Sequence, residues 1–205
     1  MVAMRSTRQS TRRAEILTGL VEIFLNEGFL DFSLEDLAVR LQCSKSTLYV
    51  VAPSKEQLIV AVVRAFFREA TDRVEERVTT EPDPVKRIGV YLDAISRELA
   101  PASSKFFADL SSFAPAHEIY LHNTAIATRR VQELVAAAEP SGHTVNAVFL
   151  GAVAGTVMES IQRGELGATT SLTDAEAYRL LADLIVAGVT KAPGARRAGG
   201  THEER

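Results

Sequence analysis

Residues 33 to 55 constrain the fold of this chain more than any other segment, because they carry two helix starts separated by a short turn. Ser33 followed by Asp36 is typical of a helix N-terminus, where the hydroxyl accepts a free backbone amide and the acid favours the positive helix end. Ser44 begins a second helix, and Pro53-Ser54 ends it. The apolar residues of the first helix recur at helical spacing and are Leu34, Leu37, Ala38 and Leu41. Two short helices joined in this way predict a helix-turn-helix, whose second helix can enter the major groove of DNA.

The second of these helices has two different faces at about 100° per residue. Its inward face carries Leu48, Val51 and Ala52. Its outward face carries Lys45, Ser46, Tyr49 and Val50, with Thr47 at the edge. A cation, hydroxyl groups and a phenol suit phosphate oxygens and base edges. An ordinary solvated helix has a similar composition, so it is the pair of capped helices that favours DNA binding.

A longer run of residues around this segment matches a known family pattern. The matching residues are Arg13-Ala14-Glu15-Ile16-Leu17, Phe24, Glu27-Gly28-Phe29, Ser33-Leu34-Glu35-Asp36-Leu37-Ala38, Ser44-Lys45-Ser46-Thr47-Leu48-Tyr49 and Pro53-Ser54-Lys55-Glu56-Gln57-Leu58. Through them, residues 12 to 63 resemble the N-terminal domain of the TetR/AcrR family of bacterial transcriptional regulators. The resemblance implies an all-helical homodimer with a three-helix head. It also implies that Ser33, Lys45, Thr47, Tyr49 and Lys55 approach DNA, mostly at phosphates; Ser46, on the outward face, completes the predicted DNA-binding set.

Four positions depart from the family pattern. Val50, Val51 and Ala52 stand where the family usually has aromatic or histidine residues and then a phenylalanine. Val50 cannot donate to a phosphate but can contact a thymine methyl group. Ala52 removes a large ring from the head, and Gln42 stands where a turn glycine is common, which is unfavourable if its φ is positive.

Charge limits the nucleic-acid surface to a small area. The first sixty residues contain seven Lys/Arg and seven Asp/Glu, and the whole chain has a formal net charge of −3. This balance excludes a general nucleic-acid coat and fits a small basic surface presented by a dimer. The basic residues at the start of the chain predict either a flexible arm that follows DNA or a disordered tail; they are Arg5, Arg8, Arg12 and Arg13.

The helical pattern continues to the end of the chain and predicts an all-α fold of about nine helices. We expect helices over residues 10–27, 34–41, 45–52, 54–79, 85–99, a short one between Pro101 and Pro115, 116–138, a helix from the Pro140-Ser141-Gly142 break to about 163, and 173–190, with a loop over 164–171. This pattern divides the chain into a DNA-binding domain over residues 10–70, an effector-binding and dimerisation domain over 71–191, and a disordered tail over 192–205.

The last two expected helices predict the homodimer interface. The first of them carries the small residues Gly151, Ala152, Ala154 and Gly155, and the second carries Leu180, Leu181, Leu184, Ile185 and Gly188. Two such helices from each subunit would form a four-helix interface, as the resemblance also implies. Packing within one chain could use the same residues.

The candidate ligand pocket is expected among the helices between residues 66 and 162. Its apolar walls are predicted from Phe66, Phe67, Tyr91, Ile95, Phe106, Phe107, Leu110 and Phe113, and its polar groups from His117, Tyr120, Asn123, Thr124, Met158 and Gln162. An apolar cavity with few polar groups suits a small hydrophobic or amphipathic effector. Aromatic residues at helical spacing are also the usual content of a core.

Other classes of function have little support. The histidines His117, His122, His143 and His202 lack the spacing of a helical zinc pair, and we expect no metal, cofactor or catalytic site. One cysteine, no leader segment and no apolar run of about twenty residues predict a cytoplasmic protein without a membrane partner.

The sequence therefore predicts a ligand-responsive repressor that binds a palindromic double-stranded DNA operator as a homodimer and is not an enzyme. The alternatives are a helical dimer with a degenerate head, acting as a ligand-binding or protein-interaction module, and a small helical enzyme.

Overall fold

The structure is a computed structural model that describes the backbone of residues 2–139 and 147–190, and the side chains from residue 11 onward within those ranges. Over these residues it consists of ten helices without any strand, which confirms the predicted all-α class. The predicted break at Pro140-Ser141-Gly142 and the predicted tail over 192–205 lie outside the described residues.

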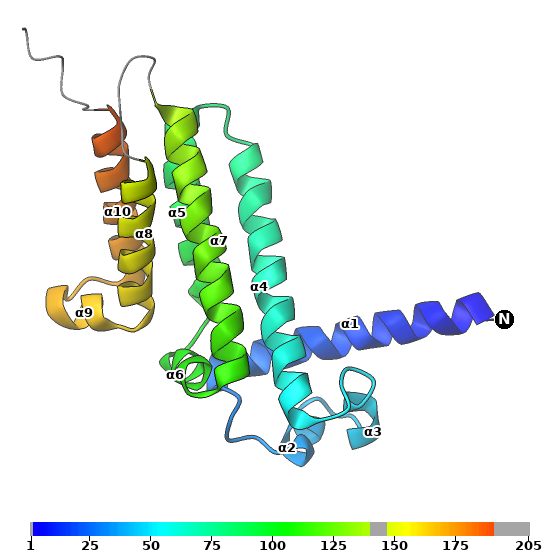
Figure 1. Ribbon diagram of the computed structural model, residues 1–205. Coiled ribbons are helices and arrows are strands. Elements are labelled where there is room, and N and C mark those ends of the chain that lie inside the picture. Colours follow the sequence, from blue (N-terminus) through cyan, green and yellow to red (C-terminus); the bar gives the residue numbers. More distant parts are fainter. Residues whose placement is uncertain (1, 140–146, 191–205) are drawn as a thin grey trace, which may run out of the picture.

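The N-terminal head consists of α1 (Val2–Glu27), α2 (Leu34–Arg40), α3 (Lys45–Leu48) and the first half of α4 (Lys55–Thr79). Helix α1 crosses α4 at a steep angle, and its N-terminal part extends away from the rest of the molecule (Figure 1). The head core is formed by apolar side chains that are almost completely buried: Ile16, Leu20, Phe24, Leu37, Leu48, Leu58, Ile59 and Val62.

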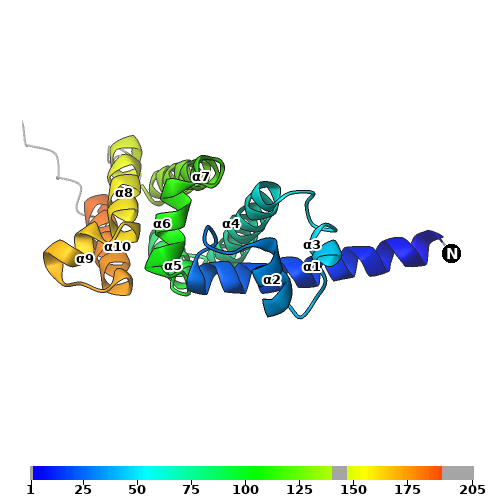
Figure 2. The same ribbon diagram turned by 90° about the horizontal axis from the view of Figure 1, so that it is seen from below.

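The body consists of helices that run beside the second half of α4 (Figure 1). They are α5 (Pro84–Leu99), α7 (Ala114–Ala138), α8 (Ala147–Gln162) and α10 (Asp174–Thr190). The short α6 (Ser104–Ser112) lies between this body and α1 (Figure 2), and the short α9 (Glu165–Thr170) connects α8 to α10. The body core includes Val74, Val78, Leu92, Val131, Val135, Leu181 and Ile185.

Helix α4 contributes to both cores. Its residues up to Ala70 pack in the head core, and Val74 and Val78 pack in the body core. The change from one core to the other therefore occurs within one continuous helix, which makes α4 a rigid connection between the two parts. The division of the chain into domains at residues 70 and 71 stays a prediction.

Three helix boundaries differ from the sequence-based expectation. Helix α1 begins at Val2 and not near residue 10, so its basic residues belong to a helix and not to a flexible arm or a disordered tail. No proline or glycine interrupts residues 2–13, which lets the helix continue outward from its packed part. A short helix, α9, also occupies the segment predicted as a loop.

The third difference is in α3, which ends at Leu48 and does not reach residue 52. The amides of Val50 and Val51 instead donate to the carbonyls of Thr47 and Leu48, three residues back. Two β-branched residues disfavour a helix, and the proline at 53 disfavours helical backbone at the residue before it. The predicted inward face is nevertheless confirmed, because Leu48, Val51 and Ala52 are buried.

Candidate DNA-binding and ligand-binding sites

Serine side chains begin both helices of the helix-turn-helix, as predicted. The Ser33 hydroxyl accepts the Asp36 amide at 3.1 Å, and the Asp36 carboxylate accepts the Ser33 amide at 2.8 Å, forming a capping box. The Ser33 hydroxyl also donates to the Asp36 carboxylate at 2.6 Å, and this hydrogen bond and the one from the Ser33 amide lower the pKa of Asp36. At α3, the Ser44 hydroxyl accepts the Thr47 amide at 3.3 Å. The start of the recognition helix is therefore fixed before DNA binds.

The predicted DNA-binding residues lie on α2, α3 and the start of α4, which together form one end of the molecule (Figure 1). Most of these side chains are exposed: Ser33, Lys45, Ser46 and Tyr49, whereas Thr47 and Lys55 are half-buried. Tyr49 follows the last residue of α3 and is 50% exposed, which is unusual for a large aromatic side chain. An exposed phenol beside an exposed lysine can contact the sugar-phosphate backbone.

The two lysines of this set differ in their contacts. Lys45 forms an exposed ion pair with Glu35 of α2, and such a pair is weak and can be exchanged for a phosphate. The Lys55 ammonium instead donates to the carbonyl of Leu30 at 2.7 Å. Lys55 therefore connects the start of α4 to the segment between α1 and α2, and its substitution would disturb the head as well as any phosphate contact.

The departures from the family pattern have local structural effects. Gln42 has a φ of 49°, so this non-glycine residue in the turn is in the left-handed region, which is unfavourable for it. Val50 is half-buried and lies in the turn after α3, so it does not project from the recognition helix itself.

A buried carboxylate joins the head to the body. Asp109 on α6 is 2% exposed and accepts the backbone amides of Phe29 and Leu30 at 2.6 and 2.9 Å. Its other oxygen accepts the ammonium of Lys105 at 2.9 Å. Gly28, at a φ of 76°, allows this approach, because a Cβ there would lie 2.6 Å from the Asp109 carboxylate. The backbone amide and carbonyl of Leu30 thus form part of a hydrogen-bonded connection from α6 to Lys55 at the start of α4.

Phenylalanine rings fill the space around this carboxylate. Phe106 contacts Phe29 and Phe66 edge-to-face, with ring centroids 6.0 and 5.7 Å apart, and Phe24 lies beside Phe29. Phe66 and Phe106 were predicted as pocket walls, but they form this core between head and body. Phe113 also packs against this core at the start of α7 and lines no cavity described here. This packing depends on how the short α6 contacts α1 and α7, which helical spacing cannot reveal. A role of these residues in ligand binding stays a prediction.

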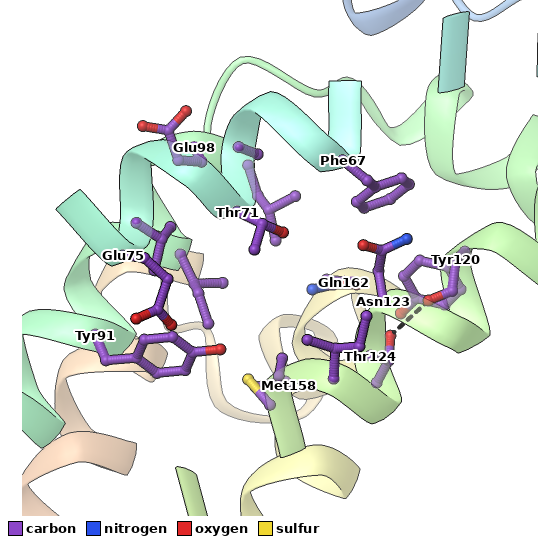
Figure 3. A pocket seen from close by; sticks show the side chains of 16 residues that line it. Phe67, Thr71, Glu75, Tyr91, Glu98, Tyr120, Asn123, Thr124, Met158 and Gln162 are labelled. Carbon is purple, nitrogen blue, oxygen red and sulfur yellow. Dashed lines mark hydrogen bonds between the residues drawn. The ribbon is translucent and has the colours of Figure 1, made fainter. Parts of the chain in front are cut away.

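The main cavity of the body lies between α4, α5, α7 and α8 (Figure 3). It has about 660 Å³ of space between the side chains, including the part open to solvent. Of the residues predicted to bind a ligand, those that line it are Phe67, Tyr91, Ile95, Tyr120, Asn123, Thr124, Met158 and Gln162. The cavity lies where the head and body cores meet, because Phe67 and Tyr120 belong to the first and Tyr91 and Met158 to the second.

A smaller cavity adjoins the first and contains three more of the predicted residues, Phe107, Leu110 and His117. It lies between α6, α7 and α8 and is lined by Phe107, Leu110, Ser111, His117, Tyr120, Glu159, Gln162 and Arg163. Tyr120 and Gln162 line both cavities, so they form the partition between them. Gln162 donates to the hydroxyl of Tyr178 at 3.0 Å.

Three polar residues of the main cavity were missed by the sequence analysis: Thr71, Glu75 and Glu98. Thr71 and Glu75 follow Phe67 at intervals of four along α4, so the helical spacing could have identified them. Glu75 receives two hydrogen bonds from Arg130, at 2.9 and 2.8 Å. Glu98 pairs with Arg73 at 2.7 Å and with Arg77 at 3.6 Å.

The tyrosines of the cavity have raised pKa values. Burial is the main cause for both Tyr91 and Tyr120, and the Glu75 carboxylate adds to the shift of Tyr91. Both phenols are therefore neutral hydrogen-bonding groups at physiological pH.

Within the described part of the chain, no three His, Cys, Asp or Glu side chains are grouped so that they could hold a metal ion. His143 and His202 lie outside it. Of the described helices, none is both long and apolar enough to cross a bilayer.

The two helices predicted to form the dimer interface, α8 and α10, divide their apolar residues between two faces. Leu181 and Ile185 are buried within the chain, and Gly151 and Gly155 accommodate Gln132 and Thr128 of α7. These glycines therefore serve packing within one chain. The large apolar side chains that stay exposed on the two helices are Val148, Phe149, Leu180 and Leu184.

Comparison with known proteins agrees with this architecture. Residues 16–62, which include the helix-turn-helix, match the family model of bacterial regulatory proteins of the tetR family. No curated protein sequence matches the chain.

Several solved structures are similar over nearly the whole chain. SCO4454, a TetR-family transcriptional regulator from Streptomyces coelicolor, has a TM-score of 0.68 at 18% identity, covering 88% of this chain and 90% of its own. A putative transcriptional regulator from Saccharomonospora viridis in complex with choline has a TM-score of 0.69 at 16% identity, covering 86% and 96%. A TetR/AcrR regulator from Thermobifida fusca has a TM-score of 0.62 at 21% identity, covering 91% and 100%.

These structures share the fold, and the family model identifies the helix-turn-helix from sequence. The chain therefore carries an N-terminal domain that matches the tetR family of bacterial regulatory proteins, within a fold that it shares with solved TetR/AcrR-family regulators.

Proposed function

We propose that the protein is a ligand-responsive repressor that binds a palindromic DNA operator as a homodimer and is released by a small effector. The observation that carries this proposal is the position of α4. Its first half packs in the head core beside the recognition helix, and its second half lines the main cavity through Phe67, Thr71 and Glu75. A ligand that moves α4 therefore also moves the head.

The joint between α6 and the head supports the same mechanism. Asp109 holds the amide of Leu30, and Lys55 at the start of α4 holds the carbonyl of Leu30. Displacement of α6 by a ligand would thus reach the recognition helix by a second route. A ligand affinity that differs between the two conformations by about 1–3 kcal/mol would give a useful switch.

The exposed apolar side chains of α8 and α10 support a homodimer. We propose that Val148, Phe149, Leu180 and Leu184 are covered by the same helices of a second copy. Pairing two heads sets the spacing of the recognition helices for two operator half-sites about one DNA turn apart.

The dimer is tested by the double substitution Leu180→Lys and Leu184→Lys. We expect the mass in solution to fall from that of two chains to that of one, because two ammonium groups cannot be buried in an apolar interface. Circular dichroism should show unchanged helicity, since both side chains are exposed in the single chain. Val39→Lys, a substitution at an exposed position on α2, should leave the mass unchanged. A double variant that keeps the mass of the unmodified protein would exclude this face as the interface.

DNA binding is tested by titrating the purified protein with its own upstream intergenic DNA at several salt concentrations, with random duplex as competitor. We expect selective binding that weakens steeply with salt, because phosphate contacts release counterions. Equal and weak binding to both duplexes would favour the alternative, a ligand-binding or protein-interaction module without specific DNA binding.

The same titration tests Lys45 against its partner. Lys45→Ala should weaken binding to all DNA sequences alike. It should also reduce the slope of log affinity against log salt concentration by about one per subunit. Glu35→Gln should strengthen binding, because it removes a negative charge beside the phosphates and frees Lys45 from its ion pair. These two variants are matched, since each breaks the same exposed pair. If both weakened binding, the pair would have a structural role in the head and Lys45 would not be a phosphate contact.

A further inference from the structure

We propose that the effector is an uncharged amphipathic molecule whose hydrogen-bonding head group, an alcohol or an amide, lies against Tyr120, Gln162 and His117. This inference depends on the proposed function, because it names the chemical class of the ligand that the cavity of the regulator would bind. Its apolar part would occupy the main cavity between α4, α5, α7 and α8.

Three buried polar atoms point to this end of the cavity. They are the hydroxyl of Tyr120, Oε1 of Gln162 and Nδ1 of His117. None has a partner with hydrogen-bond geometry within the described part of the chain, and only the Tyr120 hydroxyl has a polar side chain, Thr124, close enough to lower its pKa. Tyr120 is 8% exposed, so solvent does not reach most of its side chain. All three residues line the smaller cavity, and Tyr120 and Gln162 line the main cavity as well. Buried polar groups in native proteins are almost always paired, so three unpaired atoms in one place indicate a bound molecule.

The orientation of Gln162 adds to this argument. Its Nε2 donates to the hydroxyl of Tyr178, a residue that is 2% exposed. That hydrogen bond leaves the amide oxygen as a fixed acceptor. The Tyr120 hydroxyl can donate or accept. A ligand group that donates to Gln162 and also accepts from Tyr120 satisfies both atoms, and a hydroxyl or an amide has this double capacity.

The smaller cavity is lined by one acidic and one basic residue, Glu159 and Arg163, and the charges of the main cavity favour neither ionic class. Its only ionisable lining residues apart from the tyrosines are Glu75 and Glu98, both acidic, which disfavours an anion. A cation is not favoured either, because Glu75 is held by Arg130 and Glu98 by Arg73 and Arg77. Neither carboxylate is left without a cationic partner. The remaining attraction of the site is apolar contact and neutral hydrogen bonding.

The arrangement of the walls fits a molecule with one polar end. Figure 3 shows Phe67, Tyr120, Asn123 and Gln162 at one end of the cavity and Tyr91 beside Glu75 at the other, with Met158 between. The apolar residues that also line the cavity are Ala70, Val74, Ile95, Leu99 and Ala127. We place the head group at the end of the cavity with the unpaired atoms, because that is where hydrogen bonds are lacking.

The test uses three probes that share one skeleton and differ in charge: 4-phenylbutan-1-ol, 4-phenylbutylammonium and 4-phenylbutanoate. Each is titrated by calorimetry into the full-length protein at pH 7. We expect the alcohol to bind at least tenfold more tightly than either ion. If an ion binds more tightly than the alcohol, the proposed ligand class is wrong, whereas the ligand-responsive regulator is still supported.

Tyr120→Phe tests the position of the head group. Removing the hydroxyl should weaken binding of the alcohol about tenfold, the equivalent of one hydrogen bond. It should leave the melting temperature of the ligand-free protein unchanged or raise it, because the hydroxyl has no partner to lose. Thr156→Val, which removes an exposed hydroxyl from α8, is the matched control and should leave the affinity for the alcohol unchanged.

Two further outcomes are decisive. Unchanged affinity of Tyr120→Phe for the alcohol would overturn the placement of the head group. Failure of all three probes to bind would overturn this inference, whereas the effector half of the proposed function would still be open to ligands of another skeleton. DNA binding is measured separately, so the DNA titration alone decides the DNA-binding half of the proposed function.

Discussion

Replacing Asp109 by alanine is expected to lower the free energy of unfolding by about 3–5 kcal/mol. The carboxylate accepts two backbone amides, those of Phe29 and Leu30, in a buried position. Removing it leaves two donors without a partner, and each unsatisfied buried donor costs about 1–3 kcal/mol. Lys105 loses one of its two acidic partners but keeps Asp31, at 3.0 Å. The measurement is urea-induced unfolding at pH 7, followed by circular dichroism.

An exposed aspartate on α5 provides the control. Asp93 pairs with Arg97 at 2.8 Å with both side chains more than half exposed, and Asp93→Ala should change the stability by less than about 1 kcal/mol. If the two variants had the same stability, Asp109 would not be a structural joint. Asp109→Asn keeps the shape of the side chain and one acceptor oxygen. Its free energy of unfolding should therefore lie between that of Asp109→Ala and that of the unmodified protein.

The direction of the pKa shift of Asp109 predicts how the stability of the protein changes with pH. Burial raises the pKa of this carboxyl, but the hydrogen bonds from Lys105 and from the amides of Leu30 and Phe29 outweigh burial and lower it below its usual value of 3.8. A lowered pKa in the folded state means that the carboxylate stabilises the fold above its unfolded pKa and that this stability is lost as the pH falls through the folded pKa. The stability of Asp109→Asn should therefore decrease less steeply than that of the unmodified protein when the pH is lowered below about 4.

The parts of the fold that the sequence predicted are those set by local chemistry. The serines at 33, 44 and 54 mark the starts of α2, α3 and α4. Each serine oxygen accepts a free backbone amide three residues later, so the helix start depends only on residues close in sequence. The stop at Gly28 is of the same kind, since its φ is positive. The end of α3 was not predicted, because the competing effects of Val50, Val51 and the following proline differ by less than the gain from burying their side chains.

The candidate sites were predictable only where they lie on long helices. Phe67 of α4, Tyr120 and Thr124 of α7, and Met158 of α8 line the main cavity as expected, since the inward face of a long amphipathic helix follows from its spacing. Phe66 and Phe106 pack in the core between head and body, because their position depends on how α6 contacts α1 and α7. The Asp109 joint was missed for a related reason: its partners are backbone amides almost eighty residues away, and no side-chain pattern reports them.

Phe106→Ala is expected to lower the free energy of unfolding by about 3–5 kcal/mol. The ring is 1% exposed and contacts Phe29 of the head, Phe66 of α4 and Phe107 of its own helix. Its removal takes away apolar burial and leaves a cavity between elements from both parts of the molecule, which cannot easily collapse together. Thermal unfolding followed by circular dichroism should show a lower midpoint for the whole chain.

The neighbouring Phe107 is the matched control, because it has the same side chain on the same helix but is only half-buried. Phe107→Ala should cost less than half as much stability as Phe106→Ala. Phe106→Leu should recover most of the loss, since it refills most of the volume with an apolar side chain. Equal losses for the two alanine variants would show that α6 is held to the head by its whole surface. A large loss at Phe106 alone would locate the joint at this ring and at Asp109, three residues away on the same side of α6.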